Sequence, residues 1–241
     1  MAKQGKVTAV LFDWDLTLAH AEGIDTYGER LQTLFQQAGL NFTVADIEKA
    51  VYDYQMDTGL LGQKSPESIL QTRKNIADYY REILVRLGYV NKNWTFYDRL
   101  YDAFAKVPVK LYEDSLSILQ ALQERGLVLG IITNHSSLIR PVIAEHIGQY
   151  IDDSHVTISQ DLQIYKPDPK IFRYATRQLG ISPKHSLFVG DNLDVDAVGA
   201  VQQGGFSQGL WIDRENQPIG NKKLPERVHR ITSLSQIENF I

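Results

Sequence analysis

The sequence contains no cysteine among its 241 residues. That absence excludes disulfide bonds, thiolate metal sites, redox pairs and a cysteine nucleophile. It fits a reducing compartment, so we expect a cytoplasmic protein. The apolar run near the N-terminus follows a short polar segment, residues 1–6, and stops at Asp13. A run of that length is too short for a secretory signal peptide.

Long hydrophobic runs are missing as well. No stretch approaches ~18 apolar residues, so we expect no membrane-spanning helix. An excess of positive charge is also absent, because 29 acidic residues against 25 basic ones give a net charge of −4. Such a chain carries no electrostatic footprint for nucleic acid or an anionic membrane. An anionic substrate would have to be held by local charge, a metal or backbone amides.

Residues 19–107 have the periodicity of helices, and no segment there indicates a strand. Thr43 with Asp46 predicts one helix start, and Ser65-Pro66 predicts another. Glycines at positions 39, 88, 126 and 180 each follow an apolar stripe and are typical of helix ends. Five aromatic residues at helical spacing are expected to be core rather than a base-stacking platform: Tyr79, Tyr80, Tyr97, Tyr101 and Phe104.

The rest of the chain alternates between strand and helix patterns, which favours a parallel sheet covered by helices on both faces. The strands are predicted at residues 7–12, 127–132, 156–158, 186–189 and 210–212. The first strand is expected in the same sheet as the others, because a lone strand is not stable. The prediction is an α/β fold: a Rossmann-like parallel sheet core from residues 1–18 and 108–241, with residues 19–107 inserted as a helical domain.

Polar residues follow four of these predicted elements. In chain order they are Asp13-Trp14-Asp15-Leu16-Thr17, Thr133-Asn134, Lys166-Pro167, and Gly190-Asp191 with Asp194 and Asp196 beyond. Ligands of open parallel sheets bind beyond the carboxyl ends of the strands. We therefore expect these groups to converge on one edge of the sheet.

Taken singly, Thr133-Asn134 is typical of a turn and Lys166 of a solvated loop. Asp13 and Asp15 together are not so easily explained, because two carboxylates one residue apart past a buried strand repel each other. A bound cation usually offsets such repulsion. Mg²⁺ prefers hard oxygen ligands, which Asp13 and Asp191 would supply.

The same groups suit a phosphate monoester, which brings roughly two negative charges. A carboxylate such as Asp13 cannot approach that group unless positive charge lies between them. Mg²⁺ would supply part of that charge, and the compact ammonium of Lys166 would supply more. The hydroxyls of Thr17 and Thr133 can bind the non-bridging oxygens of the phosphate. Preorganised donors of this kind typically contribute a large part of the stabilisation of the transition state.

The order of these motifs resembles the haloacid dehalogenase superfamily of hydrolases. The shared pattern is Asp-x-Asp-x-Thr, then Thr-Asn, then Lys-Pro, then Gly-Asp with a second Asp five residues on, and it spans nearly the whole chain. The resemblance implies that Asp13 is the nucleophile that forms an aspartyl-phosphate. It implies that Asp15 protonates the leaving alcohol and later activates water, a double use that two-step covalent catalysis allows.

The other roles implied by the resemblance concern phosphate and metal. Phosphate or substrate binding falls to Thr17, which also orients the loop, and to Thr133, Asn134 and Lys166. Mg²⁺ is held by Asp13, Asp15 and Asp191, with Asp196 supporting the site indirectly and Asp194 a less favoured substitute for it. Residues 211–214 resemble the last core strand of the family.

Two positions in the first motif bear on which members of the family the chain resembles. Members that dehalogenate attack carbon and have no acid where this chain has Asp15, so the resemblance favours phosphoryl transfer. The common motif has Gly where this chain has Leu16, and a leucine does not adopt a positive φ cheaply. Either the backbone there suits leucine, or the loop differs from the common one.

The helical segment resembles the family's α-helical cap, which closes over the sheet edge, excludes water and selects the substrate. Hinges are expected at residues 19–22 and 106–110, and residues 59–64 form either a loop facing the site or a plain helix connection. A structural role is favoured for His20. A solvated helix face is favoured for Arg73 and Lys74.

The expected activity is hydrolysis of a small phosphorylated metabolite. The alternatives are a phosphomutase with the same Asp13 chemistry, a phospho-acceptor signalling domain, and a non-catalytic binding protein on the same fold. A nicotinamide enzyme is disfavoured, because no strand is followed by Gly-x-Gly-x-x-Gly. The sequence indicates neither the identity of the substrate nor the oligomeric state.

Overall fold

The structure is a computed structural model that describes residues 6–24, 26–60, 72–104, 106–216 and 223–241. It divides into two compact units. One unit consists of residues 1–20 and 111–241, and the other of residues 21–110. No helix in the described ranges has both the length and the apolar character needed to cross a bilayer.

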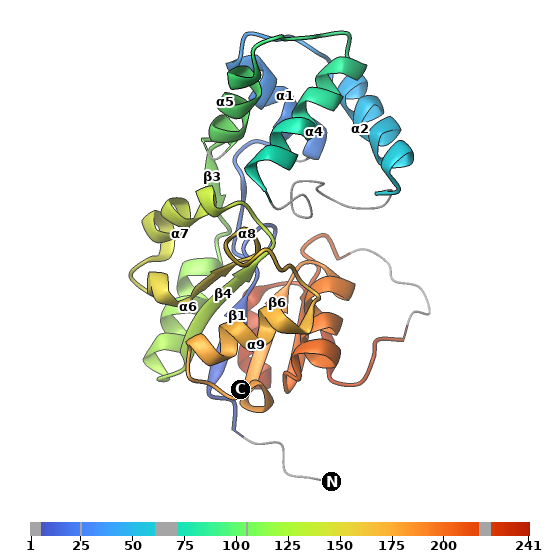
Figure 1. The fold of residues 1–241 in the computed structure, drawn as a ribbon. Helices are drawn as coiled ribbons and strands as arrows, with labels where there is room; N and C mark the ends of the chain where they lie inside the picture. Colours follow the sequence, from blue (N-terminus) through green and yellow to red (C-terminus); the bar gives the residue numbers. More distant parts are fainter. Residues whose placement is uncertain (1–5, 25, 61–71, 105, 217–222) are drawn as a thin grey trace. The chain divides into compact units, whose positions relative to one another are not determined.

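The first unit is built on a six-stranded sheet whose neighbouring strands all run parallel. In sheet order the strands are β5 (Val156–Ile158), β4 (Val128–Thr133), β1 (Ala9–Phe12), β6 (Ser186–Gly190), β7 (Gln208–Ile212) and β8 (Val228–Ile231). Figure 1 shows β1, β4 and β6 side by side in the middle of this sheet. The predicted α/β class with a parallel sheet is therefore confirmed.

The central position of β1 determines which chain segments meet at the carboxyl edge. Phe12, its last residue, lies opposite Ile131 of β4 and Val189 of β6. Each of the three strands ends within two residues of that level. The segments that follow β1, β4 and β6 consequently leave the sheet next to one another.

Helices and tighter turns connect the strands of this unit. They are α6 (Ser115–Glu124), η1 (Ser137–Ile139), α7 (Arg140–Ile147), η2 (Asp153–His155), α8 (Ser159–Leu162), α9 (Pro169–Gln178), η3 (Pro183–His185), the π-helical η4 (Leu193–Val198) and η5 (Ala200–Gly204), and η6 (Leu234–Phe240). Helix α9 lies in front of the sheet in Figure 1 and packs Phe172 against Phe188 and Phe206, with ring centroids 5.8 and 5.9 Å away. This apolar face fixes α9, and with it the segment before it that carries Lys166.

The second unit contains four helices in its described part: α1 (Tyr27–Gln37), α2 (Val44–Thr58), α4 (Arg73–Arg86) and α5 (Trp94–Phe104). Thr43 caps α2 by accepting a hydrogen bond from the Asp46 amide, as its sequence signal predicted. Thr26 and Glu29 form a capping box that starts α1. The five aromatic residues predicted as core are at most 5% exposed.

Three short strands were missed by the sequence prediction. β8 is a four-residue strand at the edge of the sheet with only its first and last residues buried, so residues 211–214 do not end the sheet. β2 (Ala19–Ala21) and β3 (Val109–Leu111) form a separate two-stranded sheet, so the segment 19–107 is not purely helical. Three residues are too few for a period-2 signal. The predicted helix start at Ser65-Pro66 lies outside the described residues.

Candidate active site

Asp13 is the first residue after the central strand. Its backbone amide donates to the Val189 carbonyl at 2.8 Å, so the sheet hydrogen bonding continues one residue past Phe12. The carboxylate is nearly buried, with the residue only 7% exposed. Its Oδ1 atom accepts a hydrogen bond of 2.7 Å from Lys166 Nζ. The structure thus brings together two predicted site residues that are 153 positions apart.

Lys166 is a buried cation with two carboxylate partners. Its Nζ lies 2.7 Å from Asp13 Oδ1 and 2.7 Å from Asp196 Oδ1, while the residue is 2% exposed. Burial acts to lower the pKa of Lys166, but Asp13 and Asp196 outweigh it and raise that pKa above its ordinary value. The lysine therefore remains charged at this site.

Asn134 holds the backbone from which Lys166 projects. The Asn134 Oδ1 accepts from the Lys166 amide at 2.7 Å, and Nδ2 donates to the Lys166 carbonyl at 3.0 Å. Both polar ends of this side chain therefore hold the Lys166 backbone, and Nδ2 keeps a second N–H that could donate elsewhere. Thr133 ends β4 and is 1% exposed. Phosphate binding by either residue stays a prediction.

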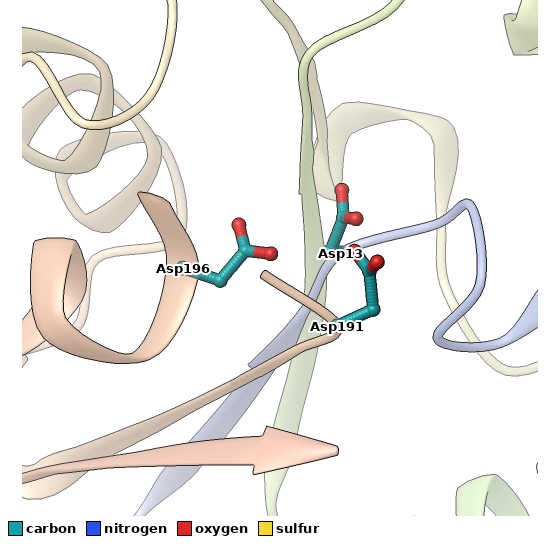
Figure 2. Close-up of side chains that lie close together, drawn as sticks. All are labelled: Asp13, Asp191 and Asp196. Carbon is teal, nitrogen blue, oxygen red and sulfur yellow. The ribbon is translucent and has the colours of Figure 1, made fainter. Parts of the chain in front are cut away.

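Three carboxylates meet at the carboxyl edge of the sheet (Figure 2): Asp13 after β1, Asp191 after β6 and Asp196 in η4. One oxygen from each lies within 4.8 Å of the others. The Asn192 amide donates to Asp196 Oδ2 at 3.0 Å, which turns η4 back over the end of β6. Asp196 therefore lies in the same acidic group as Asp13 and Asp191, and its predicted indirect role at the metal stays a prediction. Asp194 is exposed instead.

A glycine makes this close approach of η4 possible. A Cβ atom added to Gly190 would lie 2.4 Å from the Cβ of Asp196, a separation that side chains do not tolerate. Gly190, the last residue of β6, thus leaves the space in which the Asp196 side chain stands.

The charges of this group do not balance among its own side chains. Three carboxylates face one ammonium, that of Lys166. Burial raises the pKa of Asp196 to about 7, Asp13 and Asp191 add to the effect, and Lys166 opposes it. Mg²⁺ is a hard cation that carboxylate oxygens bind, and its ligands stand roughly 3–4 Å apart around an octahedron with bonds of about 2.1 Å. The donor type, spacing and excess negative charge all fit such an ion.

The segment after Asp13 forms a tight loop around the Trp14 carbonyl. That carbonyl accepts from the amides of Leu18 and Ala19 at 3.0 and 3.1 Å, and the Leu16 amide donates back to the Ala19 carbonyl at 2.7 Å. Leu16 has φ of +57°, so leucine occupies the left-handed conformation that glycine adopts without steric cost. The loop therefore tolerates a leucine at this position.

Two polar residues of this turn differ in exposure to solvent: Thr17 is buried and Asp15 is partly exposed. The Thr17 hydroxyl is fully buried, and the described residues offer it no hydrogen-bond partner. The Asp15 side chain is 35% exposed, and its Oδ2 lies 3.6 Å from His135 Nε2. Asp15 is not in the carboxylate group of Asp13, so its predicted role as a metal ligand stays a prediction.

Sequence reasoning missed His135. Its residue exposure is 7%, its amide donates to Ser159 Oγ at 3.1 Å, and its Nδ1 contacts the Ser136 carbonyl at 3.1 Å, which leaves Nε2 toward Asp15. The available signal was its position directly after Asn134, at the end of β4.

Three residues for which no catalytic role is predicted, His20, Arg73 and Lys74, contact residues outside the carboxylate group. The His20 ring packs on Tyr112 with centroids 4.7 Å apart. Arg73 pairs with Asp102 at 2.6 Å, and Lys74 pairs with Asp78 at 2.6 Å, each within the helical unit. Of the predicted loop 59–64, residues 61–64 lie outside the described residues.

Comparison with known proteins places this arrangement in a family. The family model for haloacid dehalogenase-like hydrolases matches residues 7–204. The chain is 35% identical over 96 residues to a glyceraldehyde 3-phosphate phosphatase of Methanopyrus kandleri, covering 40% of this chain and 41% of that protein. It is 30% identical over 148 residues to (S)-2-haloacid dehalogenase 1 of a Pseudomonas species, covering 60% and 61%. These matches span less than two thirds of either relative.

A solved structure is similar over almost the whole chain. It is the magnesium-bound putative hydrolase YfnB of Bacillus subtilis, with a TM-score of 0.71, 18% identity, and coverage of 98% of this chain and 99% of that one. At this identity the similarity shows a shared fold. The fold and the site define a protein with a Rossmann-like parallel sheet and a group of acidic residues at its carboxyl edge. The chain belongs to the haloacid dehalogenase-like hydrolase family.

Proposed function

We propose that the protein is a Mg²⁺-dependent phosphatase that hydrolyses a small phosphate monoester through an aspartyl-phosphate on Asp13. The observation that carries the proposal is the pair of Asp13 and Lys166, with Nζ 2.7 Å from Oδ1, inside a group of three carboxylates. A buried carboxylate with a fixed cation beside it is suited to attack an anionic phosphorus centre.

The metal would be held by Asp13, Asp191 and Asp196. When bound, Mg²⁺ supplies positive charge against which the dianionic phosphoryl group and the nucleophile can meet. Lys166 adds its own charge at the same place. Thr133 and the backbone amides after β1 and β4 would bind non-bridging oxygens.

In the first half-reaction, a carboxylate oxygen of Asp13 attacks phosphorus and forms a new O–P bond. The bond between phosphorus and the ester oxygen breaks, and Asp15 gives its proton to the departing alkoxide, which leaves as an alcohol. The partial exposure of Asp15, 35% of its side chain, suits a group that must reach a leaving group outside the buried cluster.

In the second half-reaction, Asp15 is ionised and takes a proton from water. The resulting hydroxide attacks phosphorus, and the bond to the Asp13 oxygen breaks. Inorganic phosphate is released, Asp13 is again a carboxylate, and Asp15 is again protonated. Atoms and charges therefore return to their starting arrangement after one turnover.

Dehalogenation is the second candidate, because the similar proteins include a haloacid dehalogenase. Its chemistry makes different demands. A halide leaves without a proton and attack occurs at a carbon atom that bears no phosphate charge, so neither an acid at Asp15 nor an acidic metal cluster is needed. The presence of both favours phosphoryl transfer.

The helical unit is proposed to act as the cap that selects the substrate.

The test is a panel of phosphomonoesters that includes sugar phosphates, nucleoside monophosphates and small phospho-acids. Purified protein is assayed for free phosphate with Mg²⁺ and with EDTA, while 2-haloacids are assayed for halide release. We expect phosphate release that requires Mg²⁺ and is abolished in Asp13→Asn. Hydrolysis of no ester would reject the proposal, and transfer of phosphate within a sugar without its release would indicate a mutase.

A further inference from the structure

Arg214 contacts the loop that carries the nucleophile, although it lies 197 residues from it in sequence. Its Nη2 donates to the Thr17 carbonyl at 2.6 Å. The arginine side chain is 18% exposed. A guanidinium is thus fixed on the backbone of the turn that begins at Asp13.

Asp114 holds this guanidinium from the other side. Arg214 Nη1 donates to Asp114 Oδ2 at 3.3 Å, and Nη2 donates to Oδ1 at 3.1 Å, a two-bonded fork that fixes the plane of the group. The Asp114 Oδ2 also accepts from Ser233 Oγ at 3.0 Å and from the Leu234 amide at 2.8 Å. The carboxylate therefore ties the arginine to the start of η6.

Tyr112 contacts both the Arg214 guanidinium and the backbone of the loop. The Arg214 Cζ lies 3.6 Å from the centre of the Tyr112 ring, and the Tyr112 amide donates to the Leu18 carbonyl at 3.1 Å. Ser115 Oγ donates to the same carbonyl at 2.7 Å. Consecutive carbonyls of the loop, those of Thr17 and Leu18, are therefore held by residues from the segment 112–115 and by Arg214.

The loop needs such anchoring because of Leu16. A non-glycine residue in the left-handed region is strained, and it persists only when the surrounding structure holds it there. Leu16 is 46% exposed, so packing of its side chain does little to hold it. The backbone hydrogen bonds of the Trp14 carbonyl and the Leu16 amide hold the turn from within, and the contacts on the next two carbonyls hold it from outside.

We propose that Arg214, held by Asp114, is a positioning residue that clamps the loop from Asp13 to Leu18 and so fixes the directions of the Asp13 and Asp15 carboxylates. The proposal rests on the proposed phosphatase activity for its kinetic consequences. Its geometric part, the coupling between Arg214 and the strained Leu16, stands apart from activity.

The kinetic test uses Arg214→Lys, which keeps the charge but cannot bind Asp114 through a fork and Thr17 together. With p-nitrophenyl phosphate and Mg²⁺, we expect kcat to fall about 10- to 100-fold, as for a misplaced catalytic group. KM is expected to change by less than about threefold, because substrate binding is not the interaction removed.

The matched control is Arg140→Lys. Like Arg214, Arg140 pairs with carboxylate oxygens and donates to a backbone carbonyl: it binds Asp153 at 2.9 Å and Asp161 at 2.7 Å, and it donates to the Val156 carbonyl. None of these partners belongs to the site. We expect a similar loss of thermal stability with kcat within about twofold of the unchanged protein. Equal kcat losses in the two variants would overturn the positioning role.

Leu16→Gly gives the second arm. Glycine adopts φ near +57° without strain, so the loop should need less anchoring. We expect Leu16→Gly to recover part of the kcat lost in Arg214→Lys, and the urea-unfolding free energies of the four proteins to be non-additive. Additive effects in both measurements would overturn the clamp. If the unchanged protein hydrolyses no ester, the proposed function fails, and the unfolding cycle alone decides on the clamp.

Discussion

Replacing Lys166 with methionine should destabilise the protein in a manner that Mg²⁺ reverses in part. Methionine keeps the length of the side chain but removes the charge that lies 2.7 Å from both Asp13 and Asp196. Since all three groups are nearly buried, loss of one partner leaves carboxylates without compensation, which costs about 3–5 kcal/mol. Lys166 opposes the rise in the Asp196 pKa, which is about 7 in the unchanged protein, so the variant should hold that proton to higher pH, and the cost should grow as pH rises above 7.

A divalent cation should restore part of this loss. Without Lys166 the cluster carries three carboxylates and no ammonium, so the Mg²⁺-dependent gain should exceed that of the unchanged protein. Saturation at one hundred times Kd contributes about 2.7 kcal/mol. Urea unfolding followed by tryptophan fluorescence, in EDTA and in Mg²⁺, measures both free energies.

The control for this experiment is Lys49→Met. Lys49 also lies 2.6 Å from its partner, Asp53, but the two side chains are 75% and 44% exposed. Solvent screens such a pair, so we expect a much smaller loss and no dependence on Mg²⁺. The reasoning would be refuted by equal losses in the two variants, or by a Lys166→Met loss that Mg²⁺ leaves unchanged.

Three further outcomes are expected. Leu16→Gly should raise the unfolding free energy by about 1 kcal/mol, because relief of the left-handed strain exceeds the added freedom of the unfolded chain; a decrease in urea unfolding would contradict this. Asp114→Asn should cost about 1.5–3 kcal/mol at neutral pH. Burial would raise the Asp114 pKa, but hydrogen bonds from Arg214 and Leu234 outweigh it and lower that pKa. The stabilisation is therefore present above the pKa of this carboxyl in the unfolded chain and should fade as pH falls through its pKa in the folded protein. A stability difference between Asp114→Asn and the unchanged protein that persists in acid would count against the assignment. Gly190→Ala should weaken Mg²⁺ binding about 10–100-fold, measured by calorimetry, since its Cβ would displace Asp196; unchanged affinity would contradict the close approach.

The main features of the fold and site could be predicted because they depend on local pattern and on one topological rule. Buried β-branched runs marked the central strands, and parallel strands bring their carboxyl ends to one edge. The pattern therefore predicts that Asp13, Lys166 and Asp191 lie together. Gly39 and Gly88 were expected as helix ends and both have positive φ. These signals lie within a few residues of the feature they predict.

What was missed depends on pairing between distant residues. β8 is stabilised by its neighbour β7 rather than by its own pattern, which alternates too briefly to be seen. Arg214 and Asp114 are 100 residues apart, and nothing near either residue indicates the other. The position of Asp196 depends on the π-helical turn of η4 and on the space left at Gly190. The spacing of residues in the sequence does not predict contacts of this kind, because they form only when distant segments meet in the folded protein.

The most direct test of the proposed chemistry is detection of a phosphoryl group on Asp13. Asp15→Asn should slow hydrolysis of the intermediate, because no group then activates water. The variant is mixed with Mg²⁺ and p-nitrophenyl phosphate, whose phenolate leaves without a proton from Asp15, and is then quenched in acid, digested and examined by mass spectrometry. We expect one phosphoryl group on the peptide that contains Asp13, absent when Asp13→Asn is added. Turnover by the unchanged protein together with an unmodified Asp13 peptide in every quenched sample would contradict a covalent route through this residue.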